Sequence, residues 1–361
     1  MSEPTSSAGP PAEITHLVRE RTEARATRDW TRADSLKQQI EAAGWRVVDR
    51  GAKTSVTPAA PATVAVDGEV RYGAANAVPS RLEEPSTAAV TVVLVASEAP
   101  EAVARLLSGL RVSAPPGTQV IVVANDPSSD QEGALQDGTA DRLPIAGTEP
   151  ELLRTSRRLA IGAALNIGLA RAVGEVVVLA DGSAWPTGDA LTPLLETLRD
   201  PEVAVAGGFG LAVDQAGPLQ PTALVRTDDA AVVALEGGWL AFRRTDFVAL
   251  GPLDERFVIP AWLDVWWSLR LRAGADVEVE GERADESSAE DQDASRPDSV
   301  GYAGTDRPEW PEIVLPVPRK AVRLDLPLGR DEISWPPDRS RMARRNMYRV
   351  LDKFGWRDDL T

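Results

Sequence analysis

The chain has 361 residues, 43% of them hydrophobic, with one histidine and no cysteine. A chain of this length folds as about two domains, with material for one large core. The lack of cysteine excludes disulfides, thiol catalysis and thiolate metal sites, and it fits a reducing compartment. No apolar run approaches the ~20 residues of a transmembrane helix, and residues 1–11 lack a signal-peptide pattern, which predicts a cytoplasmic protein.

The net charge of −16 argues against a nucleic-acid surface, because such proteins neutralise phosphates with Lys and Arg. More than half of this charge lies between Glu278 and Glu312, where twelve acidic residues stand against three arginines. Residues 281–309 are rich in Ser, Asp, Glu and Gly and poor in large apolar residues. We expect an acidic disordered insertion here, with a specific acidic binding segment as the alternative.

Residues 12–53 predict a small helical module. Apolar residues recur at helical spacing on both sides of Arg28, and Asp29 or Thr31 can cap the second helix. Residues 45–49 then form an expected short strand. Two antiparallel helices followed by this strand are the predicted structure.

Several residues of this module occur in a known arrangement: Leu17 to Arg21, Ala24, Arg25, Trp30, Ala33, Asp34 and the segment 44–49. In this respect the module resembles the small helical module at the C-terminal end of cysteinyl-tRNA synthetases, which implies RNA contact. Nine basic residues stand against seven acidic ones, so the module is only slightly basic, and the chain carries no synthetase catalytic signature. A packing or protein-interaction module is therefore favoured over RNA binding.

Residues 54–88 are dense in Ala, Pro, Val and Gly and are expected as a linker with short extended pieces. Residues 89–361 follow as one α/β domain. Its expected strands cover 90–95, 119–123, 175–180 and 203–206, and its expected helices cover 101–110, 156–172 and 189–199. This alternation predicts a mostly parallel, doubly wound, Rossmann-like sheet. No GxGxxG follows the first strand, so a dinucleotide site is not expected.

The stretch 176–186 contains the most informative strand end. A continuous apolar run stops at Asp181, with Gly182 and Ser183 behind it, and such runs are typical of buried parallel strands. Ligands of open α/β sheets bind at the carboxyl ends of the strands. The sequence therefore predicts that this sheet presents the Asp181 carboxylate to a ligand.

Further motifs follow in a fixed order along the chain: 123–130, 160–181, 236–244, 251–257 and 263–272. Together, over about residues 91–275, they resemble glycosyltransferase family 2, the A-type nucleotide-sugar transferases. The resemblance implies a glycosyltransferase A-type fold and sugar transfer from a nucleotide-sugar donor, with inversion, by a hexosyltransferase-type enzyme. It also implies Mg²⁺ or Mn²⁺, because hard oxygen ligands suit these ions and the departing diphosphate needs positive charge. The acceptor remains open between a glycan, a lipid-linked and a small-molecule acceptor.

The same resemblance implies roles for individual residues. Asp181 is the metal ligand, and Asp264 is the general base that an inverting transferase needs. The donor and nucleotide side comprises Ser97, Glu98, Asn125, Asp126, Asp181, Ser183, Gly237, Gly238 and Arg330. The acceptor side comprises Trp239, Trp262 and Asp254.

The chain departs from the family pattern at four places. Ser183 stands where the second metal-binding acid falls, and Leu263 where an acid precedes the base. Ala124 replaces an acid that contacts the nucleotide base, leaving Asn125 or Asp126 as substitutes. Near Arg330 the chain lacks the family's histidine. A non-catalytic nucleotide- or glycan-binding relative is therefore a second interpretation, and an assembly protein acting through its N-terminal module is a third.

Structural roles compete with these functional ones. Asp181 can close a turn, Asp264 can cap the helix that it begins, and Asp254 can belong to a surface turn. The Gly237–Gly238 pair fits either close approach to the donor or a sheet bulge. Of the adjacent tryptophans Trp266 and Trp267, at least one is expected in the core.

The C-terminal region is expected to close the domain. Strands are predicted at 312–316 and 321–326, and a helix at 338–354 with arginines along one face. Peripheral contact with an anionic membrane is one interpretation of this basic face. A docked helix with a solvated polar face is the favoured alternative.

Overall fold

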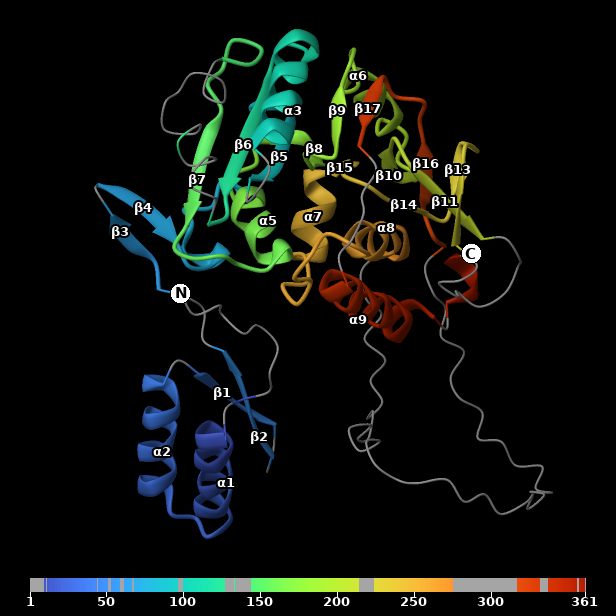
Figure 1. Ribbon diagram of the computed structural model, residues 1–361. Helices are drawn as coiled ribbons and strands as arrows, with labels where there is room; N and C mark the ends of the chain where they lie inside the picture. Colours follow the sequence, from blue (N-terminus) through green and yellow to red (C-terminus); the bar gives the residue numbers. More distant parts are fainter. Residues whose placement is uncertain are drawn as a thin grey trace, which may run out of the picture.

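The computed structural model describes residues 10, 12–43, 45–50, 53–58, 62–66, 68–96, 100–126, 133, 144–213, 224–274, 317–331, 337–355 and 357–360. The expected acidic insertion at 281–309 and the expected strand at 312–316 lie outside these residues. Figure 1 shows a small N-terminal module and a larger α/β domain. No helix among the described residues is long and apolar enough to span a membrane.

The N-terminal module consists of two helices and a β-hairpin. Its elements are α1 (Ala12–Ala26), α2 (Trp30–Ala42), β1 (Trp45–Arg50) and β2 (Lys53–Pro58), and β1 pairs with β2 in antiparallel fashion. The helices and the first strand agree with the sequence prediction, and the Asp29 side chain caps α2 by accepting the Arg32 N–H. The similarity to cysteinyl-tRNA synthetases stays a prediction.

An ion pair joins the first helix of this module to its hairpin. Arg21 on α1 donates to both carboxylate oxygens of Asp49 on β1, at 2.7 and 2.9 Å, and Arg25 adds a bond of 2.7 Å. The hydrogen bond from Arg21 is the main reason that the pKa of Asp49 falls to about 2. Helices as short as these are marginal alone, so this contact helps to hold the module together.

The α/β domain is built on a ten-stranded mixed sheet in the order β13-β16-β10-β15-β8-β5-β6-β7-β4-β3. Strands β8, β5, β6, β7 and β4 are parallel, whereas β15 runs antiparallel between β8 and β10. The strands are β3 (Val64–Val66), β4 (Glu69–Tyr72), β5 (Ala88–Ala96), β6 (Thr118–Ala124), β7 (Glu151–Thr155), β8 (Gly174–Ala180), β10 (Val203–Gly207), β13 (Ala231–Val232), β15 (Trp239–Arg243) and β16 (Lys320–Arg323). The predicted α/β class with a mostly parallel sheet is confirmed.

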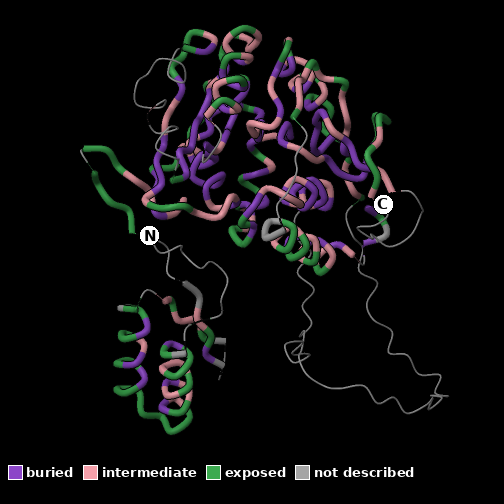
Figure 2. Tube along the Cα trace, viewed as in Figure 1, coloured by how far each residue is buried: buried purple, intermediate pink, exposed green. Residues whose placement is uncertain are grey.

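Helices cover both faces of this sheet, as Figure 2 shows by the buried strands at its centre. On one face lie α3 (Pro100–Ser113) and α6 (Thr192–Thr197), and on the other α5 (Ile161–Leu169), α7 (Arg244–Leu250) and α8 (Leu263–Ala273). Side chains of β8 alternate between the two layers, with Val176 and Val178 on the α3 side and Val177 on the α5 side. This period of two explains why the strand is apolar throughout.

Some segments differ from the sequence prediction. The stretch 54–88 contains β3, β4 and the 3₁₀ turn η1 (Ala75–Ala77), and β4 pairs with β7, so part of the expected linker belongs to the sheet. The helix expected at 156–172 begins only at Ile161, because β7 and a bend precede it. The secondary structure of both segments depends on pairing with strands that are distant in sequence. Local sequence periodicity does not reveal such pairing.

Shorter elements surround the sheet. They comprise β9 (Ala184–Pro186), β11 (Gly210–Val213), β12 (Leu224–Thr227), β14 (Ala234–Leu235), β17 (Leu328–Arg330), η3 (Asp358–Leu360) and α9 (Pro337–Phe354). α9 packs on α8 and buries Asn346, Val350 and Phe354. Its Arg341 and Arg344 side chains are exposed, as a docked helix with a solvated face requires. Membrane contact by this helix stays a prediction.

Candidate functional site

Asp181 follows β8 at the carboxyl end of the sheet, where the sequence predicted it. Its Oδ1 accepts the backbone N–H of Ser183 at 2.8 Å and also the Ser183 hydroxyl. Among the described residues, Oδ2 has no hydrogen-bond partner. One oxygen therefore closes the turn and the other is free for a ligand, so the structural and the functional roles of Asp181 are compatible.

The Gly237–Gly238 turn lies against this carboxylate. β15 begins where β8 ends, with Trp239 opposite Ala180, and the Asp181 N–H donates to the Gly238 carbonyl at 3.0 Å. Both glycines have positive φ, +76° and +78°. A Cβ on Gly238 would lie 2.4 Å from the Asp181 Cγ, so glycine is required here for close approach.

Asp264 reaches the same turn from the first turn of α8. Its Oδ2 accepts the N–H groups of Gly237 and Gly238, at 2.9 and 3.2 Å. The N-terminal cap of α8 is Trp262, in left-handed conformation with φ +70°, and no side chain caps this helix. Asp264 thus fastens the glycine turn and does not cap its own helix. Among the described residues, its Oδ1 has no hydrogen-bond partner.

The surroundings of Asp264 favour its neutral form. Burial, and next the charge of Asp181, raise its pKa to about 7, against the opposing effect of the two glycine N–H groups. Between pH 3.8 and about 7 the folded chain keeps a proton that the unfolded chain has released. The stabilisation is therefore complete below pH 3.8 and is lost as the pH rises through about 7.

We expect Asp264→Asn to remove this pH dependence, because asparagine does not titrate. The shift corresponds to a contribution on the order of 4 kcal/mol at most. With metal chelated, Asp264→Asn should differ from the parent chain in unfolding free energy by no more than about 1 kcal/mol at pH 4.5 and exceed it by up to a few kcal/mol at pH 8. Urea unfolding followed by tryptophan fluorescence measures this; an equal difference at both pH values would contradict it.

Arg330 enters the site through the pairing of β17 with β9, which sets Arg330 opposite Ala184. Its guanidinium lies 4.1 Å from the centre of the Phe209 ring and 3.7 Å from a Glu236 carboxylate oxygen. A Cβ on Gly237 would lie 2.7 Å from its Nη2. Arg330, which the sequence assigned to the donor side, therefore lies beside the glycine turn, where its guanidinium supplies positive charge.

Arg105 is a residue that the sequence did not single out. Its guanidinium lies 4.2 Å from the centre of the Trp185 ring, and it pairs with Asp331, which follows Arg330. The Asp331 N–H in turn donates to the Ser183 carbonyl at 2.8 Å. α3 is thereby linked to both strands that carry the site, and only the fold brings these residues together.

Other residues assigned to the donor side are less well placed. Ser97 and Glu98 lie outside the described residues. Asn125 is 2% exposed, and its amide bonds to the Leu159 N–H and carbonyl at 2.8 and 3.0 Å, so it orders a neighbouring loop and does not face a ligand. Asp126 is exposed, with φ +50°.

The acceptor-side assignments also need correction. Trp239 is 0% exposed and its indole N–H donates to the Ala184 carbonyl at 3.1 Å, so it packs in the core and cannot stack on a sugar. Asp254 accepts both the side chain and the backbone N–H of Arg256, as in the surface-turn alternative. Burial raises the pKa of Asp254, but the bonds from Arg256 outweigh it and the net pKa is lowered.

The remaining tryptophans of this region are mostly structural. Trp266 and Trp267 are 5% and 0% exposed, and their rings stack with centres 6.0 Å apart, so both belong to the core. Trp262 is partly buried and packs against the same core while it begins α8. It is the one predicted acceptor-side tryptophan with exposed surface.

The residues present fit a cation that arrives with a diphosphate. No group of three or more His, Cys, Asp or Glu able to hold a metal occurs within the described part of the chain. Mg²⁺ and similar ions, however, often bind through one or two carboxylates together with substrate phosphates and water. The free Oδ2 of Asp181 supplies one such ligand, and the Ser183 hydroxyl, which already donates to Oδ1, supplies no charge.

In comparison with known proteins, one family model matches part of the chain. The model of "Glycosyl transferase family 2" matches residues 91–233. No curated protein matches the chain.

Solved structures of glycosyltransferases resemble the chain at low similarity. A mannosyltransferase from Pyrobaculum calidifontis in complex with GDP-Man and Mn²⁺ is 18% identical over 54% of this chain and 55% of its own, with a TM-score of 0.41. GalNAc-T7 with UDP, GalNAc and Mn²⁺ is 15% identical over 75% of this chain and 48% of its own, with a TM-score of 0.47. S. aureus TarS 1-349 in complex with UDP is 13% identical over 50% and 53%, with a TM-score of 0.38.

The chain thus spans about half the length of the solved structures that it resembles. The family match holds Asp181 and Ser183, and the mostly parallel sheet that carries them fits the glycosyltransferase A-type fold. Residues 91–233 are accordingly identified as a match to glycosyl transferase family 2.

Proposed function

We propose that the chain is an inverting glycosyltransferase of the hexosyltransferase type, which transfers a sugar from a nucleotide-sugar donor to an acceptor hydroxyl. One observation carries the proposal. The Gly237–Gly238 turn contacts the carboxylates of both Asp181 and Asp264, each with one oxygen that has no hydrogen-bond partner among the described residues, and the Arg330 guanidinium lies next to the turn. The family match at residues 91–233 supports the same reaction class.

The charges of this cluster suit the departure of a nucleoside diphosphate. When the bond between the anomeric carbon and the phosphate oxygen breaks, negative charge grows on the diphosphate. Arg330 offers a guanidinium to it. Mg²⁺ or Mn²⁺, held by the Asp181 Oδ2, would supply further positive charge there.

Asp264 suits the other half of the reaction. The acceptor oxygen forms the new bond to the anomeric carbon while its proton passes to the Asp264 Oδ1. A base works best when its pKa lies near the working pH, and burial raises the pKa of Asp264 to about 7. Its second oxygen, fixed by two backbone N–H groups, keeps the carboxylate oriented.

A second candidate is a non-catalytic relative that binds a nucleotide or a glycan. The observation in its favour is Ser183, which stands in place of an acid and occupies Oδ1 of Asp181 with two hydrogen bonds. The third interpretation, an assembly protein acting through its N-terminal module, predicts no nucleotide binding.

Calorimetric titration of the full chain with nucleoside diphosphates, with and without Mn²⁺, separates these candidates. Binding that requires metal and disappears in Asp181→Ala is expected for the glycosyltransferase, together with turnover of a nucleotide sugar. Metal-independent binding without turnover would instead identify the non-catalytic relative. Absence of binding in both conditions would leave the assembly role.

A further inference from the structure

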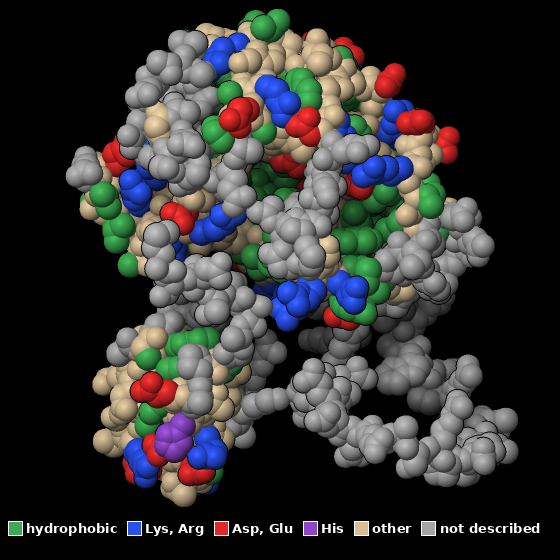
Figure 3. Space-filling view, viewed as in Figure 1, with side chains coloured by type: hydrophobic (Ala, Val, Ile, Leu, Met, Phe, Trp, Pro, Cys, Tyr) green, Lys and Arg blue, Asp and Glu red, His purple; other side chains and the backbone are tan. Residues whose placement is uncertain are grey.

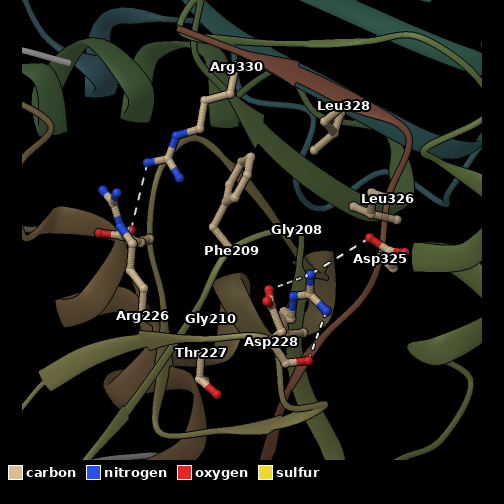
Figure 4. A pocket seen from close by; sticks show the side chains of 12 residues that line it. Gly208, Phe209, Gly210, Arg226, Thr227, Asp228, Asp325, Leu326, Leu328 and Arg330 are labelled. Atoms are coloured by element: carbon tan, nitrogen blue, oxygen red, sulfur yellow. Dashed lines mark hydrogen bonds and ion pairs between the residues drawn. The ribbon is translucent and has the colours of Figure 1, made fainter. Parts of the chain in front are cut away.

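A pocket of about 320 Å³ lies beside the glycine turn (Figure 4). Its lining comes from the turn between β10 and β11, the end of β12 and the segment that leads into β17. The apolar part of this lining consists of Phe209, Leu326 and Leu328. The volume lies at the lower end of the range found for small-molecule sites, about 300–1,000 Å³.

The charges in the pocket wall cancel. Arg226 and Arg330 share Glu236, while Arg323 pairs with Asp228 at 3.0 Å and with Asp325 at 3.7 Å. Three guanidinium groups therefore face three carboxylates, as the dashed lines of Figure 4 indicate for the residues drawn. An anionic ligand would gain no net attraction here. An alkyl chain would bury these charges without offering them hydrogen bonds.

A neutral sugar ring matches both parts of the lining. Its hydroxyl groups can donate to carboxylates such as Glu236 and accept from guanidinium groups such as Arg226. Its C–H face can cover the apolar surface of Phe209 and the leucines. On the visible face of the α/β domain in Figure 3, basic and acidic side chains are interspersed.

We propose that this pocket binds a neutral sugar ring of the acceptor, so that the acceptor is a glycan or glycoside. The assignment rests on the proposed glycosyltransferase function. Arg330 lines the pocket and also touches the glycine turn, so a sugar in the pocket lies next to the position assigned to the departing diphosphate. Donor and acceptor sites therefore share one wall.

Binding of methyl glycosides of neutral hexoses and N-acetylhexosamines to the full chain tests this directly, by saturation-transfer difference NMR with affinities from titration. We expect binding by the parent chain and about tenfold weaker binding by Arg226→Ala. The Arg226 side chain is 71% exposed, so its loss should leave the fold intact. Phe209→Leu, which keeps an apolar side chain but removes the ring, should weaken the signals of the sugar C–H protons.

Arg199→Ala is the matched control. Arg199 is also an exposed arginine at the rim of a cavity, of about 390 Å³, but it lies beyond α6 at the opposite end of the sheet. We expect this variant to bind both glycosides and nucleoside diphosphates as the parent chain does.

Four outcomes would overturn the assignment. In the first, the chain binds nucleoside diphosphates but no glycoside; in the second, the parent and Arg226→Ala bind glycosides equally well. In the third, the chain prefers phosphorylated to neutral glycosides; in the fourth, it binds glycosides but no nucleotide. The first three outcomes contradict only the assignment of the pocket to an acceptor sugar and do not affect the proposed function. The fourth removes the acceptor role because the proposed function itself fails.

Discussion

Asp181→Asn is expected to lower sugar transfer by at least ~100-fold, the scale seen when one preorganised group at a developing charge is removed. Asparagine keeps the size of the side chain and can still accept from Ser183 through its carbonyl oxygen. It replaces the free Oδ2 by an NH₂ group, which cannot hold a cation. Initial rates with a nucleotide-sugar donor and Mn²⁺ measure the effect, and donor hydrolysis by water gives a readout that needs no acceptor.

Asp200→Asn provides the control for this charge change. Asp200 is exposed and precedes β10, at the amino end of a strand parallel to β8, so it lies far from the carboxyl-end site. Rates within about twofold of the parent are expected for it. A similar loss of activity in both variants would mean that net charge or folding causes the effect. Full activity of Asp181→Asn would mean that Asp181 has no role in the reaction.

Gly238→Ala is the second change with a large expected effect. The added Cβ would stand 2.4 Å from both the Cγ and the Oδ2 of Asp181, far inside contact distance, and φ at this position is +78°. We expect the carboxylate to move, with sugar transfer reduced about 100-fold or more and an unfolding free energy lower by about 1–3 kcal/mol. Activity and urea unfolding of the same preparation give both numbers.

Gly68→Ala separates backbone strain from the clash with Asp181. Gly68 has nearly the same φ, +81°, but a Cβ there meets nothing within 4 Å. This control should lose about 1–2 kcal/mol at most and keep full activity. If Gly238→Ala also kept full activity, the close approach of the turn to Asp181 would not contribute to catalysis.

The strand ends of the parallel part of the sheet were predictable from the sequence. β8 is buried on both faces, so its apolar run is continuous, and Asp181 marks its end without ambiguity. The resemblance to the family also named Gly237, Gly238, Asp264 and Arg330, and the fold brings these four residues together, while their functional roles stay predictions.

Other features depend on contacts that no local pattern reports. Asn125 looks like a ligand-facing residue after a strand, yet its amide is taken up by Leu159, far along the chain. Trp239 lies in a motif that the family resemblance assigns to the acceptor side, yet β15 directs its indole into the layer under α3. Arg105 has no sequence signal, since its importance comes from α3 passing over Trp185.

The position of β3 and β4 fixes where the chain leaves the N-terminal module. These strands close the sheet at one edge, whereas β13 and β16 form the opposite edge, close to the segments that line the pocket beside Arg330. The module is therefore tethered across the full width of the sheet from that pocket. A partner bound to the module would thus be attached to the sheet through its β3 edge, whereas a sugar in the pocket would lie near its β16 edge.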